Sequence, residues 1–271
     1  MKKWGLSAKC ALVALVLLFM TAMSARADSV YIIGYDSALN TSVGNVLATF
    51  GDSVTYGPRY NSFNGSVSLS SYNVVLLMPA FSGGGGDMPT AGQTALTNYV
   101  AAGGGLVTAE WTGWLSGTGR LTTLSAALPA TNSNYYTYNS STVYSQNVLN
   151  SLIDHNLPAL YTFNSLVNEG GTESALVAKV GAQVFFNSSD AGLPPPPGVT
   201  FAGVVGWTYG SGHVISLSTL ANPNDLNYQQ LLANSVNWAA QTTAPVPVPG
   251  ALLLFGPGLV GLAAMRRKLR K

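Results

Sequence analysis

Residues 72–79 read YNVVLLMP, and this stretch decides the fold of the chain. It is a short, continuous apolar run, which is typical of a strand buried on both faces of a parallel sheet. Thr90–Ala102 then repeats apolar residues at the spacing of one helix face and ends at three glycines. Leu106–Glu110 (LVTAE) predicts the next buried strand. Strand, helix and strand in this order predict a parallel βαβ unit.

The residues before this unit continue the same rhythm. Val30–Tyr35 (VYIIGY) predicts another buried strand, Thr41–Phe50 a helix, and Ser53–Gly57 a shorter strand. The order β-α-β-β-α-β predicts a parallel sheet that is covered by helices.

The residues after the unit are less regular. Thr131–Ser145 is rich in Asn, Tyr, Ser and Thr, so we interpret it as an exposed loop or an edge strand. Val204–Tyr209 and His213–Ser218 flank a Gly-Ser-Gly turn, which predicts a hairpin. Asp225 is placed to cap a last helix that runs to Ala240.

The N-terminus has the pattern of a secretory signal peptide, which we place at residues 1–27. MKKW is followed by the apolar stretch ALVALVLLFM and by small residues at Ala25 and Ala27. A basic start, a short apolar core and small residues before a cut are typical of such a signal. The alternative is an uncleaved membrane anchor, for which the apolar core is short.

Charge is distributed unevenly along the chain. Nine of the twelve Lys and Arg lie in the two ends, which leaves Arg59, Arg120 and Lys179 between residues 28 and 250. All ten carboxylates lie there too, so this region has a formal charge of −7. Nucleic-acid binding is disfavoured because it depends on clustered Lys and Arg. The single cysteine, Cys10, lies in the signal, so the mature chain has no thiol nucleophile.

Residues 28–241 resemble the class I glutamine-amidotransferase-like superfamily, which includes the ThuA-like proteins. The resemblance rests on five segments: YNVVLLMP (72–79), LTNYVAAGGGLVTAEW (96–111), IDHNLPALYTF (153–163), GSGHVISLS (210–218) and NDLNYQQLLANSVNWAA (224–240). It implies one α/β domain with a flavodoxin-like, mostly parallel sheet and helices on both faces.

The chemistry of that superfamily does not carry over. Active amidotransferases hold a nucleophilic cysteine just after the strand that corresponds to Leu106–Glu110, and this chain has Glu110 and Trp111 there. The loop that would hold oxyanion donors is residues 80–86, with four glycines in a row. Its backbone N–H groups could face a ligand, or the loop could be a flexible part of the surface.

Ligands of open parallel sheets bind beyond the carboxyl ends of the strands. The residues predicted at that edge, and hence our candidate ligand-binding residues, are Tyr35, Asp36, Phe81, Gly84, Gly85, Glu110 and Trp111. Carboxylates beside aromatic rings and glycines suit a neutral polar ligand such as a sugar. The alternative is that Trp111 covers the end of the sheet and Glu110 is solvated.

Three residues are candidates for catalysis: Glu110, His155 and Asp36. Asp154 precedes His155 and could orient it as a general base, although sequence neighbours rarely point at one target. We expect no metal and no cofactor, because His, Asp and Glu are not spaced as a ligand set. The candidates would serve a hydrolase rather than an amidotransferase.

The tail begins with a proline-rich linker, residues 242–249, and continues with an uncharged stretch of sixteen residues, Gly250–Met265. As a helix this stretch would span about 24 Å, which is less than the bilayer core of about 30 Å. Basic residues from Arg266 onward would keep the end in the cytoplasm.

Residues 246–271 resemble the PEP-CTERM sorting signal of Gram-negative bacteria. The matching parts are Val246-Pro247-Val248-Pro249-Gly250, then LFGPGLVGL (254–262), then Arg266 and Arg267. Val248 stands where the family's namesake has Glu. The resemblance implies an exosortase and the inner membrane as partners, followed by transfer to the cell surface or matrix, with exopolysaccharide as a further partner. The alternative is a plain single-pass anchor.

These features predict an exported surface or matrix protein, sorted by an exosortase, with a non-catalytic amidotransferase-like domain for binding or structure. The alternative is a secreted hydrolase that acts on a carbohydrate or peptide.

Overall fold

The computed structural model describes residues 27–79, 86–109, 111–138, 141–164, 172–189, 200–219 and 222–241. The predicted signal peptide, proline-rich linker, sorting tail and C-terminal hydrophobic helix lie outside these residues. Within the described ranges, none of the helices combines the length and the apolar character that a membrane span requires.

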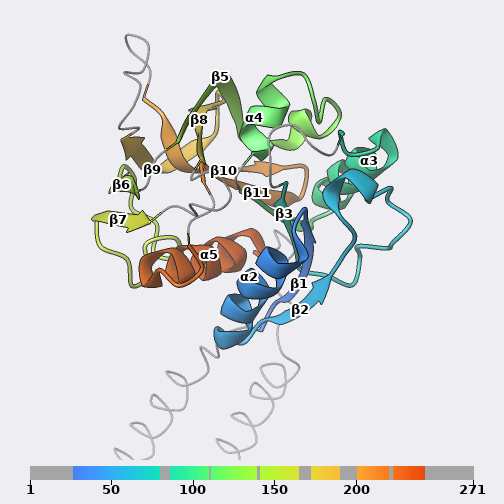
Figure 1. Ribbon diagram of the computed structural model, residues 1–271, viewed down its shortest axis with the longest axis horizontal. Coiled ribbons are helices and arrows are strands. Elements are labelled where there is room, and N and C mark those ends of the chain that lie inside the picture. Colours follow the sequence, from blue (N-terminus) through green and yellow to red (C-terminus); the bar gives the residue numbers. More distant parts are fainter. Residues whose placement is uncertain are drawn as a thin grey trace, which may run out of the picture.

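Five parallel strands form one half of the sheet (Figure 1). Their order is β2-β1-β3-β4-β11, with β1 at Ser29–Gly34, β2 at Ser53–Tyr56, β3 at Val74–Met78, β4 at Gly105–Thr108 and β11 at Gly212–Leu217. Counted along the parallel strands, this is the order 2-1-3-4-5 of flavodoxin-like folds. The predicted α/β fold with a parallel central sheet is confirmed.

Helices cover both faces of this sheet because successive strand residues point to opposite sides. Val30 and Ile32 of β1 pack with α2 (Ser37–Thr49) and α5 (Leu226–Ala239). Tyr31 and Ile33 pack on the other face, with α3 (Thr90–Ala101) and α4 (Thr112–Gly117). Two short 3-10 helices, η1 (Tyr60–Ser62) and η2 (Leu124–Ala127), join this second cluster.

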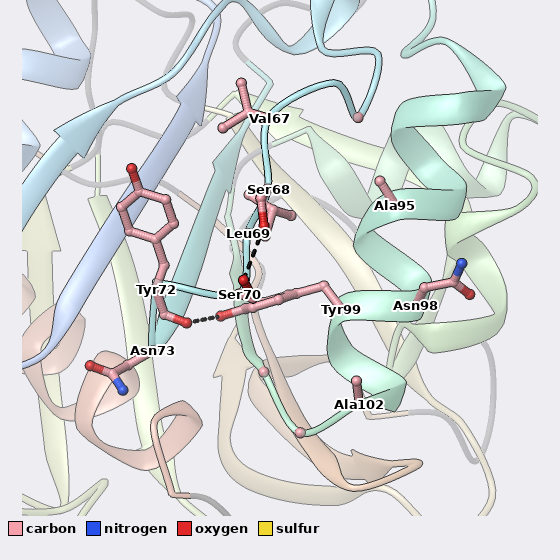
Figure 2. Close-up of a pocket in the computed structure, with 13 residues that line it drawn as sticks. Val67, Ser68, Leu69, Ser70, Tyr72, Asn73, Ala95, Asn98, Tyr99 and Ala102 are labelled. Carbon is pink, nitrogen blue, oxygen red and sulfur yellow. Dashed lines mark hydrogen bonds between the residues drawn. The ribbon is translucent and has the colours of Figure 1, made fainter.

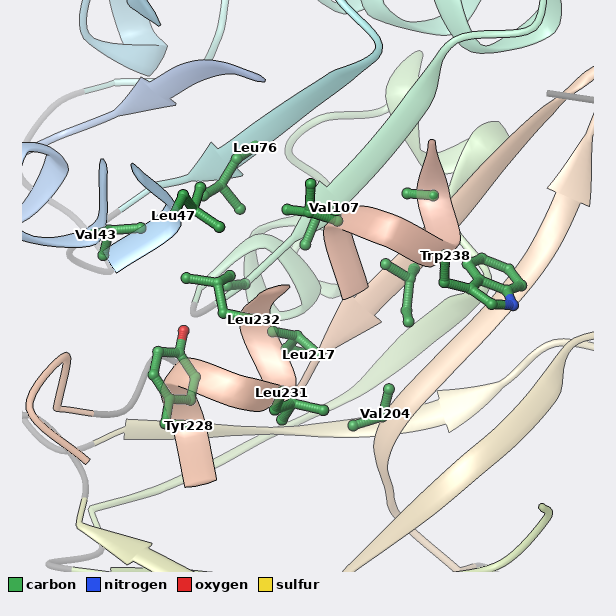
Figure 3. Packing of buried hydrophobic residues seen from close by; sticks show 14 of the residues in the cluster. Val43, Leu47, Leu76, Val107, Val204, Leu217, Tyr228, Leu231, Leu232 and Trp238 are labelled. Atoms are coloured by element: carbon green, nitrogen blue, oxygen red, sulfur yellow. The ribbon is translucent and has the colours of Figure 1, made fainter. Parts of the chain in front are cut away.

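Helix α5 packs against one face of the sheet and contributes to one core (Figure 3). Its Leu231, Leu232 and Val236 are fully or almost fully buried against the sheet. The Asp225 carboxylate caps the helix by accepting hydrogen bonds from the backbone N–H groups of Asn227 and Tyr228, at 3.0 and 3.2 Å. The predicted capped helix through Ala240 is confirmed in type and position.

The second half of the sheet is antiparallel. Strand β10 (Ala202–Tyr209) forms the predicted hairpin with β11, and the sheet continues through β9 (Gln183–Ser189), β6 (Ser141–Gln146) and β7 (Leu160–Asn164). Two further strands branch from β10: β8 (Thr172–Ala178) pairs with it, and β5 (Ala130–Tyr138) pairs with β8.

The interpretation of Thr131–Ser145 as loop or edge strand is wrong for its second part. Strand β6 lies between β7 and β9, inside the sheet. Its Thr142 and Tyr144 are fully buried, and the Tyr144 hydroxyl lies 2.7 Å from Ser218 Oγ. The polar composition hides this strand, because buried Thr and Tyr alternate with half-buried Ser and Val.

Candidate functional site

The site predicted at the carboxyl edge of the parallel strands lies where the sheet order reverses. The chain leaves β1 for β2 on one side and returns to β3 on the other side of β1. Just beyond both strands, Tyr35 N–H donates to the Met78 carbonyl at 3.2 Å. Such a switch point is the usual ligand site of flavodoxin-like sheets. We call it the switch-point site.

Asp36 and Tyr35 lie at this point but have different surroundings. Asp36 caps α2: its Oδ1 accepts a hydrogen bond from Leu39 N–H at 2.8 Å. The ring of the half-buried Tyr35 lies 5.0 Å below the Arg59 guanidinium carbon and 6.2 Å from the ring of Tyr60. The ring of Tyr35 therefore lies next to an arginine and a second tyrosine.

Tyr60 begins η1 and is buried, with 1% of its surface exposed. Its hydroxyl donates to the Gly86 carbonyl at 2.7 Å. Burial raises the pKa of Tyr60. The positive charge of Arg120 lowers this pKa, and the negative charge of Asp87 raises it. The phenol thus lies near a charged group of each sign.

Asp87 holds two segments together. Its carboxylate accepts hydrogen bonds from Met88 N–H at 2.8 Å and from Leu121 N–H at 3.0 Å. Leu121 has a φ of 51°, a conformation that costs a buried leucine about 1–2 kcal/mol. Gln93 adds to this link, since its Oε1 accepts from Thr123 N–H at 3.0 Å. These bonds fix the chain after α4 against the start of α3.

Arg120 comes directly before this fixed residue. Its Nη1 is buried and has no hydrogen-bond partner among the described residues. Arg59 and Arg120 are the two arginines between residues 28 and 250, and both lie by the Tyr35–Tyr60 pair. Neither arginine belongs to a sequence motif. The one feature that could have indicated them is that arginine is rare in this acidic domain.

Four of the predicted binding residues, Phe81, Gly84, Gly85 and Glu110, lie outside the described residues. The remaining predicted residue, Trp111, is described: it precedes α4 and is 4% exposed. Its ring packs edge-on against Trp114 at 5.3 Å, within the core cluster that contains Tyr60. Trp111 therefore contributes packing beneath the switch-point site.

His155 lies elsewhere. Its carbonyl accepts a hydrogen bond from Asn234 Nδ2 of α5 at 2.8 Å, on the face of the sheet opposite to the Tyr60 core. The Asp154 carboxylate closes its own turn by accepting from Asn150 N–H. The structure therefore places His155 away from Tyr35, Tyr60 and Trp111. In the described ranges, no group of three His, Cys, Asp or Glu could hold a metal ion.

A separate hollow lies at the amino edge of the same sheet (Figure 2). It measures about 560 Å³ and is lined by residues 65–73 and by the end of α3. The Tyr99 hydroxyl crosses it to donate to the Tyr72 carbonyl at 3.1 Å. Its polar side chains are neutral, and it lies at the edge opposite to the switch-point site.

Several solved structures resemble the chain, whereas no protein-family model and no curated protein matches its sequence. A ThuA-like protein from Parabacteroides merdae has a TM-score of 0.57 and 14% identity over 82% of this chain and 94% of its own. A ThuA-like protein from Bacteroides uniformis has a TM-score of 0.56 and 13% identity over 81% of this chain and 94% of its own.

A β-galactosidase from Rahnella sp. R3 also matches, with a TM-score of 0.56 and 14% identity over 83% of this chain. This chain spans only 33% of that enzyme, so the likeness concerns one part of a longer protein. At these identities the comparisons establish the fold alone. The chain has the fold of the ThuA-like structures, as the sequence resemblance implied.

Proposed function

We propose that this chain is an exported protein whose ThuA-like domain binds a saccharide at the switch-point site. We further propose that its tail is recognised by an exosortase in the inner membrane, which delivers the domain to the cell surface or the polysaccharide matrix. One observation supports binding most strongly. Tyr35, Arg59, Tyr60 and Arg120 gather at the edge where ligands of such sheets bind.

The described carboxylates of the site accept hydrogen bonds from backbone N–H groups. Asp36 directs one oxygen to the N-terminus of α2, and Asp87 directs both oxygens to Leu121 N–H. These carboxylates hold the backbone of the site in place. The sequence adds that Glu110 stands where an amidotransferase would have its cysteine.

A saccharide is the ligand that these groups suit. Arginine N–H groups provide hydrogen bonds, and the half-buried ring of Tyr35 provides a flat apolar surface; sugars need both. The occurrence of the fold within a β-galactosidase supports the same class of ligand.

The two ends of the described domain lie at the same edge of the sheet. Asp28 precedes β1, and a Cβ added at Gly105, which opens β4, would lie 2.4 Å from the Ala239 carbonyl near the end of α5. Both ends therefore leave at the amino edge of the parallel strands.

Deleting Pro245–Lys271 tests the sorting part of the proposal. The full chain and the deletion variant are expressed in a Gram-negative host that has an exosortase, and cells are fractionated. We expect the full chain in the membrane and surface fractions, and the variant free in the periplasm or medium. A matched variant that keeps the tail but carries Val248→Glu restores the family's motif and should sort at least as well. Equal distribution of the full chain and the deletion variant would contradict the proposal.

A further inference from the structure

The two arginines of the switch-point site indicate what kind of saccharide it takes. We infer that the site binds an acidic saccharide, with Arg59 and Arg120 holding its carboxylate. This inference rests on the proposed function, because it specifies the ligand of the same site. It adds the chemical class, and it identifies the residues that would distinguish an acidic sugar from a neutral one.

Arg59 is held in a way that leaves its donors available. Its guanidinium carbon lies 5.0 Å from the centre of the Tyr35 ring. A guanidinium that stacks on an aromatic ring keeps its five N–H donors in its own plane, where they match both oxygens of a carboxylate. The cation–π contact with Tyr35 thus holds the side chain without using its hydrogen bonds.

The position of Arg120 is fixed through the backbone of the next residue. Asp87 binds the N–H of Leu121, the next residue, which has the uncommon φ of 51°. Nη1 of Arg120 is buried and lacks a hydrogen-bond partner among the described residues. Buried polar groups in folded proteins nearly always have a partner, and a charged one is costly to leave alone. An acceptor supplied by a ligand would satisfy this donor.

The described carboxylates near the two arginines are bound to backbone groups. Asp36 interacts with the N-terminus of α2, whose backbone dipole compensates a carboxylate. Asp87 is compensated by the N–H groups of Met88 and Leu121. The overall charge of −7 is spread over the whole domain, and charges farther away than about 8 Å are screened at physiological salt. The described carboxylates at the site are therefore compensated by backbone N–H groups.

Titration calorimetry on the full chain in mild detergent tests the inference, with trigalacturonate, galactotriose and inorganic phosphate as probes. We expect trigalacturonate to bind about tenfold or more tightly than galactotriose. Arg59→Ala and Arg120→Ala should each weaken its binding about tenfold or more, as expected for a lost charged hydrogen bond. Phosphate should compete weakly, because it lacks the sugar rings.

Lys179→Ala is the matched control, since it also removes one positive charge. Lys179 donates to the Ser125 carbonyl and lies 5.2 Å from the Trp207 ring, so its loss should leave affinity unchanged. Arg120→Gln removes the charge but keeps an unbranched side chain with an N–H donor, and it serves if Arg120→Ala does not fold. It too should weaken binding while the thermal unfolding curve stays cooperative.

Each other outcome overturns a separate claim. Equal binding of both sugars, unaffected by the arginine variants, would overturn the acidic ligand and leave saccharide binding in place. Absence of binding by either sugar would overturn saccharide binding itself. Phosphate that competes as well as trigalacturonate would mean a simple anion site, and an equal loss in Lys179→Ala would mean a non-specific charge effect. Both results contradict the inference.

Discussion

Asp36 is a candidate catalytic residue in the sequence, and in the structure it caps a helix. If its role is to cap α2, Asp36→Ala should destabilise the protein by about 1 kcal/mol, while Asp36→Asn should change stability by only a few tenths. Asp225→Ala is the matched control, because Asp225 caps α5 in the same way. Urea unfolding followed by circular dichroism measures all three. Equal losses in Asp36→Ala and Asp36→Asn would mean that the charge matters and the cap does not.

The sequence placed Tyr35 and Asp36 correctly at the end of β1, because residues that follow a buried strand must lie at the sheet edge. It could not place Arg59 and Arg120 there. They reach the site from a loop after β2 and a loop after α4, and the paths of these loops depend on tertiary contacts such as Asp87 to Leu121. Loop positions of this kind have no periodic signal in the sequence.

At the scale of elements, the turn of the β10–β11 hairpin is fitted against α3. Ser211 N–H donates to the Ala101 carbonyl at 3.0 Å, and Gly210 has a φ of 61°. A Cβ on Gly210 would lie 2.6 Å from the Ala101 backbone, whereas one on Gly181, with a φ of 90°, meets nothing within 4 Å.

These two glycines make a matched pair of predictions. Gly181→Ala should cost about 1–2 kcal/mol for the left-handed conformation alone. Gly210→Ala should cost about 3 kcal/mol or more, because overpacking against α3 adds to the same strain. Thermal unfolding of both variants measures the difference. Equal destabilisation would show that the turn does not press against α3.

The sequence predicts most accurately the elements that have long apolar runs or regular helix spacing. β1, β3, β4, α3 and α5 appear within two residues of their predicted bounds. Strand β6 was missed because its inward residues are Thr and Tyr, which look polar until their partners are known. The antiparallel half of the sheet depends on such pairings between distant segments, and composition does not reveal them.

At the scale of the whole molecule, we expect buried tyrosines to limit stability at alkaline pH. Burial raises the pKa values of Tyr31, Tyr60, Tyr99 and Tyr161. The folded state therefore holds these protons more tightly than the unfolded state, whose tyrosines titrate near pH 10. Their contribution to stability is complete below about pH 10 and is lost as the pH rises through the folded values.

We expect the protein to unfold cooperatively above pH 10, with the buried tyrosines ionising in the same transition. Burial lowers the pKa of Lys179, so this one group acts in the opposite direction. Absorbance at 295 nm and circular dichroism, followed together, measure the transition, and Tyr56→Phe, which changes an exposed tyrosine, should leave its midpoint unchanged. Tyrosines that all ionise near pH 10 while the fold persists would contradict the burial argument.

The central claim is that the domain is exported and that the two ends of the chain are targeting signals. The most direct test is the intact mass of the protein purified from cells that have an exosortase. We predict a mature chain that begins at Asp28 and lacks the basic end, Arg266–Lys271. A mass that still contains Arg266–Lys271 would show a plain anchor, and one that still begins at Met1 would show that the signal is not removed.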